Sequence, residues 1–392
     1  MPSTSGDPRV VIAGGGVAGS EALLALAALA RKRLDVTLVS AQPDFHYRFL
    51  DIDEPFGLGR ARRYALDALA QAAGARFVCD TVGRVDVAGR RVLLGGGDEL
   101  PYDALLLATG AATVPAFEYG VSFDLLLEQD AFDEVLADNR AGFAPSVAII
   151  VPAGVSWTLP AYELALRMAQ WMRETGEPAL TLLTPEPEPL GVFGPQAAAE
   201  VARVLTDAGI AVRGGTVAEP VSNTTYRVAP SGEWAEVDRI VALPQLAGVP
   251  IPGVPCDDGG WVPVDEHGRV PGCEGLYAAG DGTSFWMKQG GIAAQQADVA
   301  AQHIAVTLGG SEREPEPFRP VLRGMLRTRD GARYMRIDLA DGHPPEVSDA
   351  PLWWPPGKIA SRWLAAHLSD AERDAEDRER YLRRVADARR RR

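Results

Sequence analysis

A cluster of glycines between a predicted strand and a predicted helix constrains the fold more than any other feature of this chain. Residues 10–13 form a short apolar run that is typical of a buried strand. The alanine- and leucine-rich residues 18–34 have the periodicity of a helix. Residues 14–19 join the two and read GGGVAG, which matches the pattern GxGxxG. A strand, a glycine turn and a helix in this order predict a dinucleotide-binding unit.

Each glycine of this turn has a separate physical role. Gly14 permits the tight bend, Gly16 lets the backbone approach a pyrophosphate, and Gly19 lets the helix pack closely. The phosphates would lie at the positive end of the helix, next to Val17 and Ala18. These five residues are predicted to bind the cofactor, and a glycine-rich turn without a ligand is the alternative.

The elements that follow predict a doubly wound α/β fold. Residues 36–40 form a second strand and complete a βαβ unit. A similar order returns with a strand at 147–151, a helix at 159–173 and a strand at 179–184. We therefore expect an α/β protein with two Rossmann-like dinucleotide-binding domains. Beyond residue 310 the chain becomes charged and rich in proline and tryptophan, which indicates a small C-terminal domain.

The first βαβ unit also offers a ribose contact and a second glycine turn. Ser40 ends the second strand where an acidic residue would usually bind the ribose, so its hydroxyl is the predicted, weaker partner. A later strand, residues 102–110, ends in Ala108, Thr109 and Gly110. Taken alone, this second segment is equally consistent with a structural strand and turn.

A third segment places an acid and a cation near the same turn. Residues 275–281 read GLYAAGD and end in Gly280 and Asp281, whose carboxylate can accept a hydrogen bond from a cofactor hydroxyl. Lys288, Gln289 and Gly290 then open a helix predicted at 292–308. The positive end of that helix favours negative charge on a bound group.

In order and spacing, the three segments resemble the pyridine nucleotide-disulfide oxidoreductase superfamily over residues 9–308. The resemblance implies FAD as cofactor, with Asp281 at the ribityl hydroxyls and Lys288 near the flavin N1 and C2 edge. It also implies an FAD domain of residues 1–115 and 245–310, interrupted by an NAD(P)-type Rossmann domain of residues 116–244. Residues 311–392 would be the C-terminal domain.

The inserted domain lacks an ordinary nicotinamide site. Its loop, residues 151–163, reads VPAGVSWTLPAYE, in which Pro152 has no backbone N–H and Trp157 is too large to admit a pyrophosphate. The loop looks like that of sulfide:quinone oxidoreductases and flavocytochrome c sulfide dehydrogenases. The first catalytic cysteine of those enzymes falls on Trp157, and no cysteine follows Cys273, so a sulfide-oxidising cysteine pair is excluded. Glu186 keeps NAD(P)H use open, because it stands where an acid would bind the ribose.

Three side chains are candidate catalytic residues. Lys288 would stabilise negative charge on the reduced flavin. Glu163 would carry protons, with an exposed helix glutamate as the alternative, and His46 would relay protons, with a surface or capping histidine as the alternative. The tryptophans at 353, 354 and 363 would form an aromatic pocket for a planar acceptor or, alternatively, pack the C-terminal domain.

Composition excludes several other classes of protein. The net charge of −14 disfavours nucleic acid, and no apolar run reaches the ~18–20 residues that cross a bilayer. The histidines have no metal-ligand spacing, and we expect no metal. Cys79 is predicted to be a core thiol, and Cys256 and Cys273 are predicted to be structural. We expect a cytoplasmic protein without a signal peptide, whose charged final helix, 370–392, is solvated or contributes to a homodimer.

Three hypotheses on function follow. The main one is an FAD-dependent oxidoreductase that passes electrons from a small-molecule substrate through flavin to an acceptor, for which a quinone is one candidate. The second is an NAD(P)H dehydrogenase or quinone reductase with a modified nicotinamide site near Gly154 and Glu186. The third is a flavin-binding interaction protein in which FAD is structural.

Overall fold

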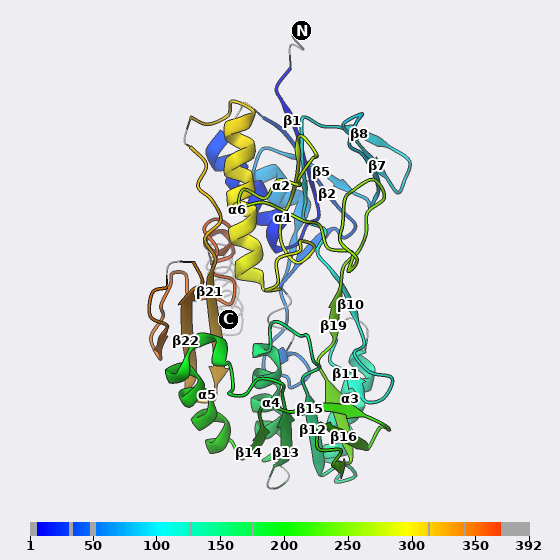
Figure 1. Ribbon diagram of the computed structural model, residues 1–392, viewed down its shortest axis with the longest axis vertical. Coiled ribbons are helices and arrows are strands. Elements are labelled where there is room, and N and C mark those ends of the chain that lie inside the picture. Colours follow the sequence, from blue (N-terminus) through cyan, green and yellow to red (C-terminus); the bar gives the residue numbers. More distant parts are fainter. Residues whose placement is uncertain are drawn as a thin grey trace, which may run out of the picture.

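Two five-stranded parallel sheets form the framework of this computed structural model (Figure 1). The structure describes residues 6–30, 34–47, 52–124, 128–174, 176, 178–312, 314–340 and 342–369. The predicted tail helix 370–392 lies outside the described residues. The predicted α/β fold class with Rossmann-like units is confirmed.

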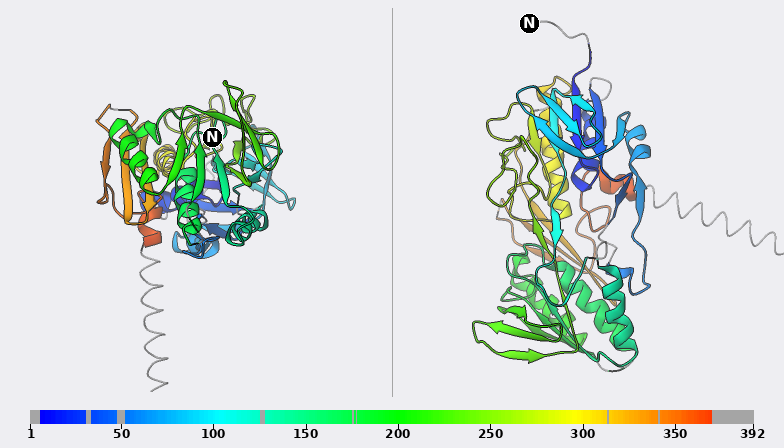
Figure 2. Two further views of the ribbon diagram at one scale, coloured as in Figure 1. Left: turned by 90° about the horizontal axis from the view of Figure 1, so that it is seen from below. Right: turned by 90° about the vertical axis from the view of Figure 1, so that its right-hand side faces the viewer.

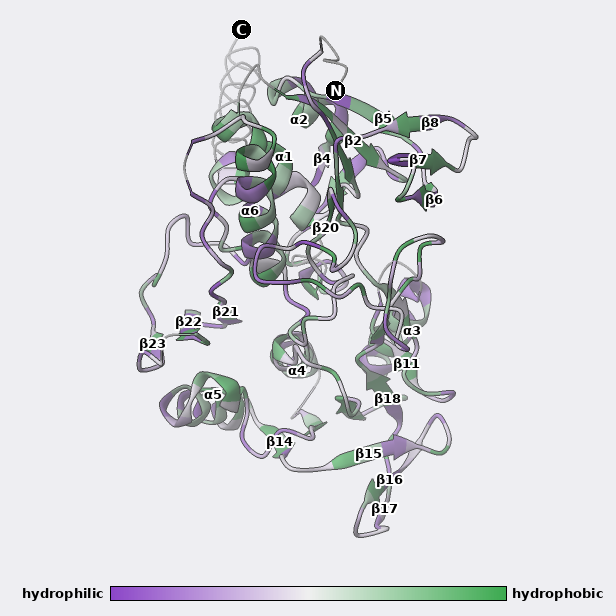
Figure 3. Ribbon diagram, turned by 45° about the horizontal axis from the view of Figure 1, so that its top comes forward, coloured by the Kyte–Doolittle hydropathy of each residue, from purple (hydrophilic) through white to green (hydrophobic). Residues whose placement is uncertain are grey.

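The first sheet carries the glycine turn at the carboxyl end of its central strand. Its order is β20 (Leu276–Ala278), β9 (Ala104–Leu107), β1 (Arg9–Ala13), β2 (Asp35–Ser40) and β5 (Arg76–Cys79). All neighbours are parallel, and the register aligns Val10 with Val36 and with Ala104. Helices α1 (Val17–Ala30) and α6 (Gly290–Thr307) pack against each other, with α2 (Leu66–Ala72) nearby. In Figure 3, α1 is drawn mostly in the colour of hydrophobic residues, as its burial requires.

The second sheet has the same architecture. Its order is β11 (Val121–Ser122), β18 (Arg239–Ala242), β12 (Ser146–Ile150), β13 (Ala179–Leu183) and β14 (Ile210–Arg213), again all parallel. Its helices are α3 (Gln129–Arg140), α4 (Leu159–Met172), the short 3-10 helix η3 (Gly191–Phe193) and α5 (Pro195–Asp207). Figure 2 shows this sheet and the first one as two lobes along the length of the molecule.

An antiparallel pair of short strands joins the two lobes. It consists of β10 (Ala112–Val114) and β19 (Gln245–Ala247), and the predicted domain boundaries at 115 and 245 fall beside it. Small antiparallel elements decorate each lobe: β3 (Asp44–His46) with β4 (Arg63–Ala65), β6 (Val82–Asp86) with β7 (Arg91–Leu94) and β8 (Glu99–Pro101), and β15 (Val217–Pro220) with β16 (Thr225–Ala229) and β17 (Trp234–Glu236).

The C-terminal part packs onto both lobes. Strands β21 (Val321–Thr328), β22 (Gly331–Asp338) and β23 (Glu346–Ser348) form an antiparallel sheet. In the described part of the chain, Leu322 and Leu326 join the core of the second lobe, whereas Ile359 and Leu364 join the core of the first. This region therefore shares its apolar contacts with its neighbours rather than enclosing a core of its own.

A buried carboxylate ties the end of the described chain to its first helix. Glu21 of α1 is fully buried and accepts hydrogen bonds from the backbone N–H groups of Arg362, Trp363 and Leu364 at 2.9, 3.0 and 2.6 Å. Trp363 and Leu364 lie at the start of the helix that begins at residue 364, where backbone N–H groups lack partners within the helix, so Glu21 caps that helix from another element. No helix among the described residues is long and apolar enough to cross a bilayer.

Candidate active site

The glycine turn has the geometry that its sequence predicts. Gly14 has a φ of +120°, and a Cβ there would lie 2.1 Å from the carbonyl oxygen of Ala108. A Cβ on Gly19 would lie 1.7 Å from the carbonyl oxygen of Gly14, so this glycine allows α1 to approach the turn. Gly16 is different, because a Cβ there would meet open space. Gly14 and Gly19 thus shape the chain, and Gly16 leaves room for a ligand.

The three predicted segments surround one cavity of about 660 Å³, here called the glycine-loop cavity. All but one of the predicted cofactor-binding residues line it: Gly14, Gly16, Val17, Ala18, Ser40, Ala108, Thr109, Gly110, Gly280, Asp281, Lys288, Gln289 and Gly290. Gly19 does not, because its role is in packing. His46 lines the same cavity, beside Gln42 and Asp44. A site at the carboxyl ends of parallel strands, with a helix N-terminus and open glycine backbone, fits a dinucleotide such as FAD.

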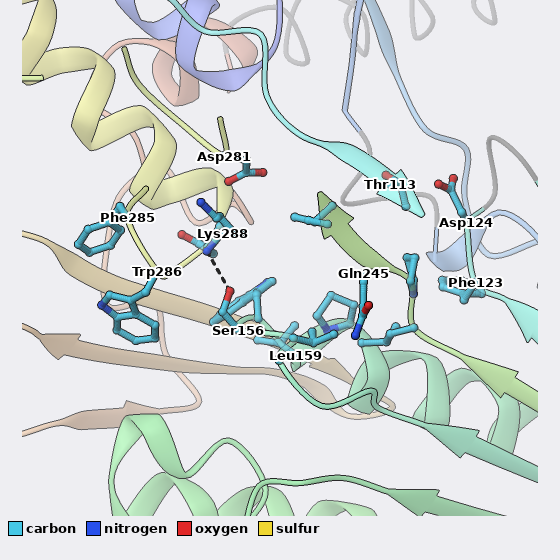
Figure 4. A pocket seen from close by; sticks show the side chains of 18 of the residues that line it. Thr113, Phe123, Asp124, Ser156, Leu159, Gln245, Asp281, Phe285, Trp286 and Lys288 are labelled. Carbon is cyan, nitrogen blue, oxygen red and sulfur yellow. Dashed lines mark hydrogen bonds between the residues drawn. The ribbon is translucent and has the colours of Figure 1, made fainter. Parts of the chain in front are cut away.

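A second cavity of about 690 Å³ lies between the lobes and is here called the tryptophan cavity, after Trp157, Trp261 and Trp286 in its wall. Figure 4 shows Phe285 and Trp286 at one end and Phe123 and Asp124 at the other. Four residues line both cavities: Trp157, Asp281, Lys288 and Gln289. The two cavities therefore adjoin at the start of α6.

Lys288 is held at this junction by several contacts. Its backbone N–H donates to the Ser156 hydroxyl at 3.1 Å, and its ammonium group donates to the carbonyl of Thr283. The ammonium nitrogen also lies 3.9 Å from the centroid of a Trp261 ring. Burial lowers the pKa of Lys288, and the nearby carboxylate of Asp281 opposes this shift.

Gln289 connects the junction to the C-terminal sheet. Its side-chain oxygen accepts from the N–H of Ile292 at 2.9 Å and caps α6. Its side-chain nitrogen donates to the carbonyl of Arg323 on β21 at 3.2 Å. The same side chain therefore fixes the start of α6 and one wall of the tryptophan cavity.

Glu163 belongs to a buried network of charges. Its side chain is 1% exposed, forms an ion pair with Lys358, and accepts from the backbone N–H and the Nε of Arg327 at 3.0 and 3.5 Å. Arg327 also binds Asp53 at 2.6 Å, and Asp53 binds Arg167 at 2.7 Å. Burial lowers the pKa of Lys358, while the Glu163 carboxylate opposes the shift. Glu163 and Lys358 both line the tryptophan cavity.

This burial contradicts the alternative of an exposed helix glutamate. Helix α4 packs against β21, so Glu163 faces the C-terminal sheet instead of solvent. The sequence did not reveal Lys358, Arg327 or Asp53 as partners, because they lie more than a hundred positions away and belong to no motif. The spacing of residues along a single sequence gives no indication that these four side chains come together.

In the second lobe, side chains of the protein occupy the positions where a nicotinamide nucleotide would be expected to bind. Trp157 packs edge to face on Phe193, with ring centroids 6.2 Å apart. Glu186 accepts a hydrogen bond from the buried hydroxyl of Tyr162 at 2.6 Å, and burial raises the pKa of both groups. The acid expected at a nicotinamide ribose is thus already engaged within the protein.

The prediction that Cys79 is a core thiol was wrong, and the two alternatives for the C-terminal tryptophans can now be separated. Cys79 is exposed, because it ends the edge strand β5. The tryptophans of the C-terminal region line neither cavity: Trp353 donates to the carbonyl of Gly357 at 3.0 Å, Trp354 is 80% exposed, and Trp363 donates to Asp298 at 2.9 Å. Trp353 and Trp363 therefore agree with the packing alternative, Trp354 faces solvent, and Trp157, Trp261 and Trp286 supply the aromatic wall. Cys256 is exposed and Cys273 is half-buried, and no cysteine lines either cavity.

Comparison with known proteins agrees with this geometry. Residues 8–302 match the family model described as pyridine nucleotide-disulphide oxidoreductase. An NADH dehydrogenase-like protein of Mycobacterium tuberculosis is 29% identical over 294 residues, which cover 70% of this chain and 72% of that protein. The sulfide:quinone oxidoreductase of Aquifex aeolicus superposes with a TM-score of 0.76 at 19% identity, over 87% of this chain and 86% of that one. Putidaredoxin reductase, solved in complex with putidaredoxin, superposes with a TM-score of 0.60 at 19% identity, over 85% of this chain and 82% of that one.

Proposed function

Because this chain belongs to the pyridine nucleotide-disulphide oxidoreductase family and is an FAD-dependent oxidoreductase, we propose that it carries electrons from a small-molecule substrate through FAD to a quinone acceptor. The observation that carries this proposal is the meeting of the two cavities at Trp157, Asp281, Lys288 and Gln289. A cofactor in the glycine-loop cavity would there face a molecule in the tryptophan cavity.

The residues of the glycine-loop cavity suit the parts of FAD in order. The open backbone at Gly16 and the start of α1 suit the pyrophosphate, and Ser40 suits the adenosine ribose. Asp281 suits the ribityl hydroxyls, and the start of α6 at Gly290 suits the flavin ring. When bound, FAD supplies the capacity to accept and return two electrons.

The tryptophan cavity has the lining that a planar acceptor requires. Its wall offers the aromatic surfaces of Trp157, Trp261, Phe285 and Trp286. A quinone is the proposed acceptor because the structural neighbour from Aquifex aeolicus is named a sulfide:quinone oxidoreductase. A quinone that becomes a hydroquinone takes up two electrons and two protons. The two electrons and one of the protons would come from the reduced flavin, and the second proton would come through the protein.

Proton transfer is assigned to Glu163, with Lys358 as its positioning partner. Glu163 lines the cavity although it is buried, so a proton on its carboxyl group would be in reach of a bound acceptor. Lys288 would stabilise negative charge on the reduced flavin. His46 lines only the glycine-loop cavity, so its proton relay stays a prediction that would act at the cofactor alone.

NADH is the second candidate donor, because the Mycobacterium tuberculosis relative is named NADH dehydrogenase-like. Against it stand the large side chain of Trp157 and the hydrogen bond that occupies Glu186. A structural role for FAD is the third candidate. The cytoplasmic location and the homodimer also stay predictions.

The decisive experiment mixes the purified, FAD-loaded protein with reductants under anaerobic conditions while the visible absorption of oxidised FAD is followed. We expect slow or no bleaching with NADH and NADPH, and rapid return of the absorption when photoreduced protein meets menadione. Fast bleaching by NADH would establish the second candidate. Photoreduced protein that no quinone reoxidises would leave FAD with a structural role. In Trp157→Gly, we expect a gain of nicotinamide nucleotide binding.

A further inference from the structure

Arg323 is a cation in the wall of the tryptophan cavity that neither the cofactor nor the proton path uses. It lies on β21, where every second residue, Leu322, Gly324 and Leu326, is buried in the core. The alternate residues Arg323 and Met325 line the cavity. Gln289, which lines both cavities, donates to the backbone carbonyl of Arg323. Arg323 therefore stands near the end of the cavity that adjoins the cofactor site.

Among the residues that the structure describes, no carboxylate forms an ion pair or hydrogen bond with the Arg323 side chain, although Asp338 is near enough to act on it electrostatically. Across the hairpin its register partner is Arg336, which forms its own ion pair with Glu346 at 2.7 Å. The Nε of Arg323 is buried and makes no hydrogen bond within the described chain. Burial and the neighbouring Arg336 lower the pKa of Arg323, with Asp338 opposing them.

The other cations of this cavity are engaged. Lys358 is paired with Glu163, and Lys288 is bound to the Thr283 carbonyl and lies over Trp261. A guanidinium group that is partly removed from water and lacks an anion is costly unless a ligand provides one. Its fork of donors matches the two oxygens of a carboxylate or sulfonate.

We propose that the tryptophan cavity takes a planar aromatic compound that carries an oxyanion substituent, and that Arg323 binds this anion. This inference rests on the proposed function and specifies its substrate class. The aromatic ring would lie among Trp157, Trp261 and Phe285, while the oxyanion meets the guanidinium group. A neutral quinone of the same size would gain the ring contacts but leave Arg323 unpaired.

The test compares two probes on the oxidised, FAD-loaded protein: menadione, which is neutral, and naphthoquinone sulfonate, which is an anion. Binding is measured at equilibrium from the perturbation of the flavin spectrum. We expect the wild type to bind the sulfonate at least ~10-fold more tightly. In Arg323→Met, the ratio of the two affinities should fall by ~10- to 100-fold, the range for lost charged hydrogen bonds.

The matched control is Arg336→Met. This substitution also removes a positive charge from the β21–β22 hairpin, but Arg336 does not line the tryptophan cavity. We expect its affinity ratio to stay within about threefold of the wild type. Arg323→Lys keeps the charge and loses the fork, so it should retain part of the preference. If Arg323→Met does not fold, the affinity ratio of Arg323→Lys tests the proposal in its place.

An unchanged ratio in the Arg323 variants, or an equal fall in Arg336→Met, would overturn the inference. The proposed function fails separately, when photoreduced wild-type protein is not reoxidised by menadione. Because the binding ratio is read on oxidised protein without turnover, the two failures are distinguishable.

Discussion

Replacing Lys358 by methionine tests whether the buried charges hold the lobes together. Lys358 and Glu163 have side chains that are 7% and 1% exposed, and they come from the C-terminal region and from α4. Lys358→Met keeps most of the apolar stem and removes the ammonium group. Glu163 then keeps only its hydrogen bonds from Arg327.

The expected cost follows from what remains around Glu163. Removal of one partner from a buried ion pair costs ~3–5 kcal/mol, because the other charge stays buried without compensation. Arg327 still donates to the same carboxylate, so we expect the lower end, ~3 kcal/mol in the free energy of unfolding. Glu163→Gln should cost a similar amount, and the double variant should cost ~2 kcal/mol less than the sum.

The assay is urea unfolding of the FAD-loaded proteins with excess FAD, followed by tryptophan fluorescence. Arg91→Met is the control, because Arg91 and Glu99 form an exposed pair whose loss should cost less than ~1 kcal/mol. If Lys358→Met costs as little as this control, or if the two single costs simply add, the network does not couple the lobes and the reasoning is wrong.

Three further predictions concern the cofactor site and the second lobe. Gly14→Ala should purify with less than ~10% of the wild-type FAD content, because its Cβ would lie 2.1 Å from the carbonyl oxygen of Ala108. The FAD content is measured from the flavin-to-protein absorbance ratio. A normal FAD content would contradict the role of this glycine turn in FAD binding. Lys288→Met should have a lower flavin reduction potential than Lys288→Arg in dye titrations. The difference in potential between Lys288→Met and wild type should shrink as pH rises through the lowered pKa of the lysine. A difference that does not change with pH would contradict the role assigned to the Lys288 charge. Since burial raises the pKa of Glu186, this acid stabilises the fold below its ordinary value of 4.5, and the contribution is lost as pH rises through the raised pKa. Glu186→Gln should therefore gain stability relative to wild type as pH rises above 4.5, as urea midpoints would show, whereas a constant difference would exclude this titration.

The glycine-loop cavity was predictable because patterns within a few residues of the chain determine its lining. A glycine that needs a positive φ, a strand that ends in glycine and a helix that starts beside an acid each leave a pattern within a few residues. These patterns placed Gly14, Thr109 and Asp281 at one cavity although they are far apart in the chain.

The tryptophan cavity was not predictable in the same way. Its charged residues, Glu163, Arg323 and Lys358, come from elements whose association depends on tertiary packing, and no spacing links them. The aromatic wall was missed for the same reason: single tryptophans from three loops, Trp157, Trp261 and Trp286, form it, and the adjacent pair at 353 and 354 does not. Edge position, which exposes Cys79, is likewise a property of the sheet and not of the strand.

The order of strands in the first sheet has a consequence for synthesis on the ribosome. Strands β1, β2, β5 and β9 emerge early, but β20 and the start of α6 follow only after the whole second sheet has been made. A nascent chain that ends before residue 288 lacks Lys288, Gln289 and Gly290, which line the glycine-loop cavity. The backbone donors of Glu21 are made later still, because they belong to residues 362–364. We therefore expect FAD to bind only late in synthesis, and chains that terminate before residue 288 to purify without flavin.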